Sequence, residues 1–291
     1  MITPKSLIRE IEELGGLGQL VTTYEFIAAA AMRRIRNSVL ENRAFHMGLN
    51  RIFQEIKRAY EEEIRKFVSR RRFRSRMPIP FLRRPRKTAI VFLSANTSLY
   101  GDIIAKTFAS FMTEVEKKSA DIVIIGRIGR TLFDEEKRKE KYTYFDFPDT
   151  TIVVENLKAI SRYLSQYEKV VVYHGRFKSL ISQDAAATSV SGDELESSGA
   201  ADEDARYFFE PSLETIVLFF ETEIFGSLLE QVFNESRLAK LASRMILLDR
   251  ASVNVEDALK KMSLERQRLT HRVFNRKQLD LLSGIGLWYS A

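Results

Sequence analysis

The chain has 291 residues, of which 45% are hydrophobic and 29% charged, and this composition is typical of a folded protein. Lysine and arginine outnumber aspartate and glutamate by 46 to 39, and the resulting net charge of +7 favours acidic partners such as nucleic acid, anionic lipid or an acidic protein surface. The chain has no cysteine, which excludes disulfides, thiolate nucleophiles and cysteine-ligated metals. No apolar run reaches the roughly 18 to 20 residues of a membrane-spanning helix, so we expect a soluble protein.

A heptad pattern runs through residues 1–69 and predicts a coiled-coil helix there. Its seam positions, at alternating steps of three and four, are Val21, Tyr24, Ala28, Ala31, Ile35, Ser38, Asn42, Phe45, Leu49, Ile52, Ile56, Ala59 and Glu63. Gly15, Gly16 and Gly18 each cost roughly 1 kcal/mol inside a helix. We therefore expect a break that separates a short helix near 5–14 from a long one near 19–68.

A stricter heptad pattern lies in residues 211–291. Its seam positions are Leu238, Leu241, Met245, Leu248, Ser252, Val255, Leu259, Met262, Arg266, Leu269 and Val273. Between Pro211 and Ser283 there is no further proline, so a single helix of roughly 100 Å is predicted at 1.5 Å per residue. Two seams at opposite ends of one chain predict a long antiparallel coiled coil, and the four alanines at 28–31 mark a close approach of its two helices.

The middle of the chain, residues 88–210, alternates short apolar β-branched runs with helical stretches, which predicts a Rossmann-like α/β domain with a mostly parallel sheet. The expected strands are 87–94, 121–126 and 169–175, and the expected helices lie near 102–118 and 152–167. A basic linker, 70–87, precedes this domain. Residues 184–205 are small and acidic and predict a flexible loop, and residues 206–210 follow as a candidate edge strand.

Motifs for catalysis or cofactor binding are weak. No P-loop is present, and "GRIGR" (126–130) fits a strand-to-helix turn better than a phosphate site. The three histidines, His46, His174 and His271, lack metal-ligand spacing, and no serine stands in a nucleophile motif. We therefore predict no catalytic residue, cofactor or metal in this chain.

Two other functions remain open from the residues alone. The arginine-rich stretch 70–76 is compatible with a coiled-coil scaffold that binds RNA or an anionic membrane. A parallel sheet is also compatible with an enzyme that binds a small molecule, although no catalytic constellation supports that hypothesis.

Several stretches, in the same order along the chain, resemble the gamma subunit of rotary F-type ATP synthases, the central rotor shaft. They are "EFIAAAAMRRI" (25–35), "SANTSLYGDI" (94–103), "IIGRIGRTLF" (124–133), "VVYHGRFKSLISQ" (171–183), "FFEPSLETI" (208–216) and "SRMILLDRASVNVEDALKKMSLERQR" (243–268). The firmest single matches are Arg244, Met245, Asp249, Ala251, Asn254 and Leu264. The chain resembles a divergent member, because each stretch departs from the family pattern at some positions.

The resemblance implies a noncatalytic shaft that couples rotation driven by ion flow to ATP synthesis or hydrolysis in the catalytic beta subunits. The implied partners are the alpha and beta subunits of the catalytic ring, the epsilon subunit and the c-ring of the membrane sector, with no specific nucleic acid. ATP, ADP and magnesium would bind the partner subunits only. The implied location is a peripheral complex on the cytoplasmic side of the inner (plasma) membrane.

The resemblance also implies which residues contact the catalytic ring. They are Tyr24, Phe26, Thr270, His271, Leu287 and Trp288. The family's Arg-Gln pair in the last helix aligns with Thr270 and His271, so that contact is altered here. The family's charged Asp-Arg pair is replaced by Asn96 and Thr97.

Overall fold

The computed structural model describes residues 4–59, 87–117, 120–136, 140–190 and 213–288. Several expectations fall outside these residues: the end of the N-terminal helix at 60–69, the basic linker 70–87 except for residue 87, including its arginine-rich stretch 70–76, residues 191–205 of the predicted flexible loop, and the edge strand 206–210. The described chain divides into two units. Unit 1 comprises residues 1–30 and 245–291, and unit 2 comprises residues 31–244.

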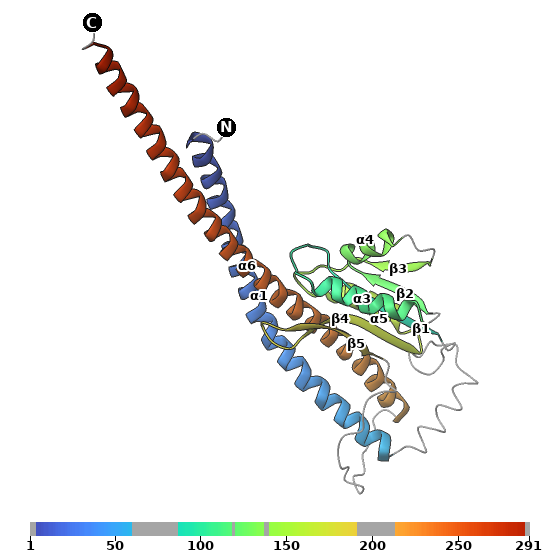
Figure 1. Cartoon of the computed structure of the whole chain (residues 1–291). Helices are drawn as coiled ribbons and strands as arrows, with labels where there is room; N and C mark the ends of the chain where they lie inside the picture. Colours follow the sequence, from blue (N-terminus) through green and yellow to red (C-terminus); the bar gives the residue numbers. More distant parts are fainter. Residues whose placement is uncertain (1–3, 60–86, 118–119, 137–139, 191–212, 289–291) are drawn as a thin grey trace. The chain divides into compact units, whose positions relative to one another are not determined.

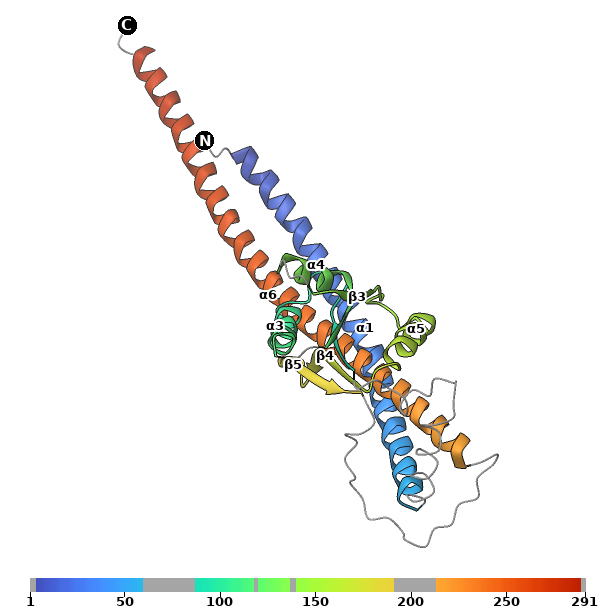
Figure 2. The same cartoon turned by 90° about the vertical axis from the view of Figure 1, so that its right-hand side faces the viewer.

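Two long helices begin and end the described chain. Helix α1 spans Pro4–Ala59 and helix α6 spans Leu213–Trp288. At 76 residues, α6 is about 114 Å long at 1.5 Å per residue, which confirms the prediction of one uninterrupted C-terminal helix. Within unit 1, residues 4–30 of α1 run alongside α6 (Figures 1 and 2).

The predicted helix break at the N-terminal glycines is wrong, because α1 is continuous through Gly15, Gly16 and Gly18. A Cβ added at Gly18 would lie 3.2 Å from Cγ1 of Val255 on α6, whereas Gly15 and Gly16 have no such neighbour within 4 Å. Each glycine destabilises a helix by only about 1 kcal/mol relative to alanine. The packing of α1 against α6 elsewhere in unit 1 outweighs this cost.

The two helices are antiparallel in unit 2. His46 Nδ1 lies 3.2 Å from Ser227 Oγ, and the rings of Phe53 and Phe220 are 6.0 Å apart. From His46 to Phe53 the chain advances seven residues, and from Ser227 to Phe220 it goes back seven, which is one heptad on each helix.

Half of the predicted α1 seam is correct and half is shifted by one residue. Ala28, Ile35 and Ile56 are buried as predicted, but Phe45 and Ile52 are 57% and 47% exposed. The side chains buried between the correct positions are Met32, Val39, His46 and Phe53, each one residue further along. The observed seam therefore advances from Ala28 by four residues and then by three, whereas the predicted seam advances by three residues and then by four.

A five-stranded sheet forms the centre of unit 2. Its strands are β1 (Thr88–Leu93), β2 (Asp121–Ile125), β3 (Tyr142–Phe145), β4 (Lys169–Phe177) and β5 (Gln183–Ser189). They lie in the order β3-β2-β1-β4-β5, and only the β4–β5 pair is antiparallel. The mostly parallel sheet is confirmed. The flexible loop predicted from residue 184 is wrong as far as residue 189, because these residues pair with β4.

Helices cover both faces of this sheet. Helices α3 (Ile103–Val115) and α4 (Arg127–Glu135) pack on the face that carries Ile90, Phe92 and Ile124. Helix α5 (Val154–Leu164) and part of α6 pack on the other face, which carries Val91 and Leu93 (Figures 1 and 2). A strand covered on both faces is apolar at every position, which is why β1, β2 and β4 could be recognised as short apolar runs.

Candidate functional site at the junction of helix α6 and the sheet

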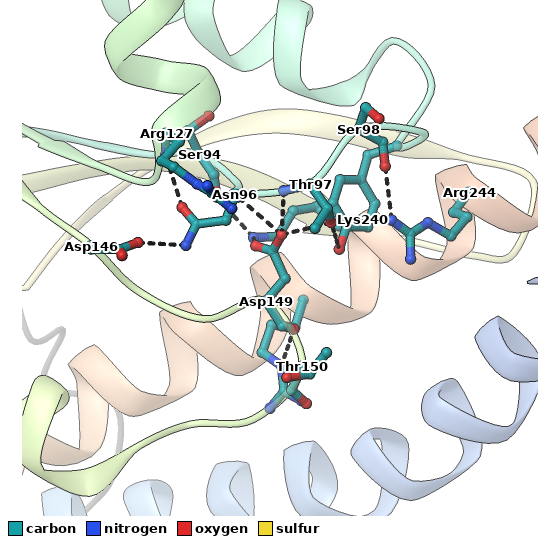
Figure 3. A network of polar contacts seen from close by, with 12 residues as sticks. Ser94, Asn96, Thr97, Ser98, Arg127, Asp146, Asp149, Thr150, Lys240 and Arg244 are labelled. Atoms are coloured by element: carbon teal, nitrogen blue, oxygen red, sulfur yellow. Dashed lines mark hydrogen bonds and ion pairs between the residues drawn. The ribbon is translucent and has the colours of Figure 1, made fainter.

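Polar side chains gather where the parallel strands end. The carboxyl ends of β1, β2 and β3 share one edge of the sheet, the edge at which open α/β sheets commonly bind ligands. Here, side chains of α6 lie against the loops at that edge (Figure 3). We call this group the junction cluster; it comprises Ser94, Asn96, Thr97, Ser98, Tyr100, Arg127, Asp146, Asp149, Thr150, Arg237, Lys240 and Arg244.

Asp149, in the loop after β3, is the acceptor at the centre of the cluster. Its Oδ2 accepts hydrogen bonds from the backbone nitrogens of Asn96 (2.9 Å) and Thr97 (2.7 Å) and from the Thr97 hydroxyl (2.8 Å). These bonds tie the loop after β1 to the loop after β3. The other oxygen, Oδ1, faces Lys240 Nζ at 3.7 Å.

Lys240 carries its charge into the interior of unit 2. Its side chain is only 7% exposed, and the facing side chain of Asp149 only 5%. Nζ donates a 2.8 Å hydrogen bond to the carbonyl oxygen of Ser94, at the end of β1. Burial lowers the pKa of Lys240 to about 8, although the Asp149 carboxylate acts in the opposite direction. Desolvation therefore outweighs the attraction of the pair, as is common for buried ion pairs.

Arg237 and Arg244 lie on either side of Lys240 along α6 and donate to backbone carbonyls of the same loops. Arg237 binds the carbonyl oxygens of Asp149 and Thr150. Arg244 binds those of Ser98 (2.8 Å) and Leu99 (3.3 Å), and its guanidinium lies 4.0 Å from the ring centre of Tyr100. Leu99 holds its carbonyl there with a left-handed backbone, φ 71°, at a cost of about 1 kcal/mol.

The turn after β2 confirms the strand-to-helix interpretation of "GRIGR". Gly126, with φ 100°, precedes α4, and an added Cβ would lie 2.8 Å from the backbone nitrogen of Ala95. The first helical amide, Arg127 N, donates to Oδ1 of Asn96 at 2.8 Å. An anion at this helix start would compete with the Asn96 side chain for that amide.

The space left inside the junction is small. A cavity of about 10 Å³, lined in part by Ser94, Gly126, Asp149 and Lys240, has room for about one water molecule. A nucleotide does not fit there while α6 is in place. The small-molecule enzyme hypothesis therefore gains no support from this edge of the sheet.

The sheet and α6 approach each other closely at Gly101, which has φ 60°. A Cβ added at Gly101 would lie 2.6 Å from Ser243 Oγ and 3.8 Å from Ser243 Cβ. The loop after β1 therefore passes very close to α6 at these two small residues.

The residues predicted to contact the catalytic ring belong to α1 and α6 of unit 1, whereas the junction cluster belongs to unit 2. Tyr24 and Phe26 are 48% and 72% exposed, and Thr270 and His271 are also exposed. The Thr270 hydroxyl donates to the carbonyl of Arg266 one turn earlier. Leu287 and Trp288 belong to α6 by their backbone, and their side chains lie outside the described part of the chain.

The histidines occupy ordinary structural positions. His174 is fully buried, with Nδ1 3.0 Å from the Gly175 carbonyl and Nε2 2.9 Å from the Thr188 hydroxyl, and burial lowers its pKa. His46 is bonded to Ser227, and its pKa is also lowered by burial. Among the described residues, no group of three or more His, Asp or Glu side chains is arranged to hold a metal ion.

Three of the stretches that carry the gamma-subunit resemblance meet in the junction cluster: 94–103, 124–133 and the start of 243–268. A family model described as ATP synthase matches residues 3–275. The chain belongs to the ATP synthase gamma family. Among the described residues of this gamma chain, no helix is both long enough and apolar enough to cross a membrane.

Relatives of the gamma chain match it over nearly its whole length at low identity. The ATP synthase gamma chain of Geotalea daltonii is 22% identical over 302 residues, and that of Chloroherpeton thalassium 23% over 301 residues. The alignments cover 98% of this chain in both cases, and 98% and 97% of the relatives.

Solved structures share the fold. The central stalk of the Tetrahymena thermophila mitochondrial ATP synthase aligns with a TM-score of 0.54 at 16% identity, over 80% of this chain and 99% of that one. A chain of the Euglena gracilis mitochondrial ATP synthase aligns with a TM-score of 0.50 at 12% identity, over 90% and 96%. These likenesses confirm the predicted fold of long terminal helices around an α/β domain.

The junction cluster itself was not predicted. Asn96, Thr97 and Arg244 were noticed only as positions in family motifs, and Lys240 and Asp149 were not singled out at all. A lysine within a heptad segment ordinarily indicates a solvated helix face. Lys240 lies beside the predicted seam position Leu241, but Glu235, Arg237 and Arg244 are also charged, so the sequence has no signal that singles out Lys240.

Proposed function

We propose that this gamma chain is the noncatalytic rotor of an F-type ATP synthase or ATPase, and that it couples ion-driven rotation to ATP synthesis or hydrolysis in the catalytic beta subunits. The observation that carries the proposal is the family match over residues 3–275. The chain itself would bind no nucleotide, and ATP, ADP and magnesium would bind the ring subunits. The complex would lie on the cytoplasmic side of the inner (plasma) membrane.

The geometry of unit 1 supports this proposal. Every described side chain of α6 from 270 to 282 is exposed, including Phe274, Leu279, Leu281 and Leu282 at 56–69%. A lone helix with large exposed apolar side chains needs a surrounding partner. A ring of alpha and beta subunits would enclose this segment and would also contact Tyr24, Phe26, Thr270 and His271.

The sheet domain of unit 2 would meet the epsilon subunit and the c-ring. One solved structure with this fold comes from an assembly of a central stalk with a c-ring, and another from an assembly that includes F1 and a c-ring. The net charge of +7 is compatible with acidic partner surfaces, and no specific nucleic acid is required.

Coexpression with the cognate alpha and beta subunits tests the proposal. The expected result is a stable complex whose ATPase activity depends on the gamma chain. A chain ending at residue 269 should assemble more weakly, because it lacks the exposed helix, whereas substitution of the exposed Lys158 of α5 by Gln should have no effect. Absence of any complex, or activity indifferent to the gamma chain, would contradict the proposed function.

A further inference from the structure

Rotation of a shaft is useful only if the part that meets the ion-translocating sector cannot turn independently of the helix that meets the ring. In unit 2 the sheet domain, residues 88–190, packs on α6 through a largely apolar surface. Apolar contacts are non-directional and fix neither register nor rotation by themselves. What sets the position of α6 along this surface must therefore be directional.

The directional contacts lie at the junction cluster and come from one row of cations on α6. Arg237, Lys240 and Arg244 stand three and four residues apart, on one face of the helix. Each donates to a backbone carbonyl at the carboxyl edge of the sheet, and Lys240 also faces Asp149. A rotation of α6 about its own axis would move all three away from their acceptors.

Of these three residues, Lys240 is the one whose presence is least explained by a contribution to folding stability. It is the most deeply buried of the three, and its charge is held against the cost of desolvation. A buried ion pair in which the desolvation cost outweighs the attraction between the charges contributes little to stability. The best-attested use of such a pair is to specify the register between two elements.

We propose that Lys240 is a positioning residue that, together with Asp149 and the Ser94 carbonyl, fixes the sheet domain on α6 so that the two turn as one body throughout the catalytic cycle. This inference rests on the proposed rotor function. It adds that the sheet domain stays docked on α6 while the shaft rotates, and that the buried pair of Lys240 and Asp149 keeps it docked.

A disulfide across the junction tests the closed state directly. Because the natural chain has no cysteine, two introduced cysteines can pair only with each other within one chain. An added Cβ at Gly101 lies 3.8 Å from Ser243 Cβ, which matches the usual Cβ separation of a disulfide, about 3.8 Å. In the assembled complex, oxidised Gly101→Cys/Ser243→Cys is expected to keep the ATP-driven ion transport of its reduced form. The two single-cysteine variants under the same oxidant are the controls.

A second experiment tests Lys240 itself, with the ratio of ions transported to ATP hydrolysed as the readout. Lys240→Met is expected to lower this ratio at least about twofold while hydrolysis continues, because a loosened supporting contact lets the domain slip. Lys260→Met on the same helix is the matched control, since Lys260 is exposed and paired with Glu256 one turn away. In the Lys240→Met background, forming the 101–243 disulfide is expected to restore the ratio.

Three results would overturn the proposal: loss of transport on oxidation in the otherwise natural chain, an unchanged ratio in Lys240→Met, or no rescue by the disulfide. If Lys240→Met does not fold, the disulfide in the natural background still decides whether the junction stays closed. Failure of the chain to assemble with ring subunits would instead contradict the proposed function. Such a failure is detected in the coexpression experiment, before transport is measured.

Discussion

Helix α6 passes through two contrasting environments without a change of secondary structure. From 224 to 243, in unit 2, every side chain is buried or half-buried, and from 270 to 282, in unit 1, every side chain is exposed. Both segments are helical, and both carry large apolar side chains. Helix formation in α6 therefore does not depend on burial, and what surrounds each segment sets its role.

The two segments also divide the tasks that a shaft requires. The buried segment binds its own chain through the junction cluster and the apolar core of unit 2. The exposed segment carries large apolar side chains, which we expect to contact the catalytic ring. Substitutions in one segment or the other test whether the two segments differ in this way.

The largest expected effect is at Phe233, which is 1% exposed and lies edge-on to Phe147 with 4.6 Å between ring centres. Phe233→Ala should lower the free energy of unfolding by about 3–5 kcal/mol, because it leaves a cavity in a packed core. The matched change Leu282→Ala, at 65% exposure, should stay within about 0.5 kcal/mol. Urea unfolding followed by circular dichroism measures both, and equal effects would erase the contrast between the segments.

A pH dependence separates the buried lysine from exposed ones. The pKa of Lys240 is about 8 in the folded chain against an ordinary 10.5, so between these values the unfolded state binds more protons and stability rises with pH. Relative to Lys240→Met, the free energy of unfolding of the natural chain should rise by about 3 kcal/mol over this window. Unfolding curves of both proteins from neutral pH to 10.5 give the difference. A difference independent of pH would mean that Lys240 is solvated.

Two glycines should respond to alanine in opposite directions. Gly126→Ala should lower the free energy of unfolding by about 2 kcal/mol or more, because the new Cβ meets the Ala95 backbone at a φ of 100°. Gly15→Ala should raise it by about 0.5–1 kcal/mol, because Gly15 is in a helix interior with open space beside it. Thermal unfolding of the two variants is the measurement. A destabilised Gly15→Ala would indicate that α1 needs flexibility there.

The smallest expected effect on stability is at Phe26, which is 72% exposed. Phe26→Ala should change the free energy of unfolding by less than about 0.5 kcal/mol, yet weaken binding to the catalytic ring about tenfold. Phe45→Ala, at 57% exposure but in unit 2, is the control expected to leave ring binding unchanged. Affinity of the gamma chain for a preformed ring decides the outcome, and equal losses in both variants would remove Phe26 as a specific contact.

The features that could be predicted from the amino-acid sequence are those whose signal repeats along one segment. The two heptad patterns predicted α1 and α6, and the apolar runs predicted β1, β2 and β4. The seam of α1 is half correct because a heptad pattern with apolar residues at both neighbouring positions, such as Ala31 and Met32 or Ile52 and Phe53, does not show which of them faces the partner helix.

The remaining features depend on contacts between elements that are distant in the chain. Strand β5 reads Gln-Asp-Ala-Ala-Ala-Thr-Ser, which has little strand preference of its own and is extended because β4 pairs with it. Helix α1 continues through its three N-terminal glycines, of which Gly18 packs on Val255 of α6. Lys240 and Asp149 are 91 residues apart in the chain and meet only after the sheet docks on α6. Local propensities are worth about 1 kcal/mol per residue, whereas burial and pairing of whole elements are worth several times more, so the long-range contacts prevail where the two disagree.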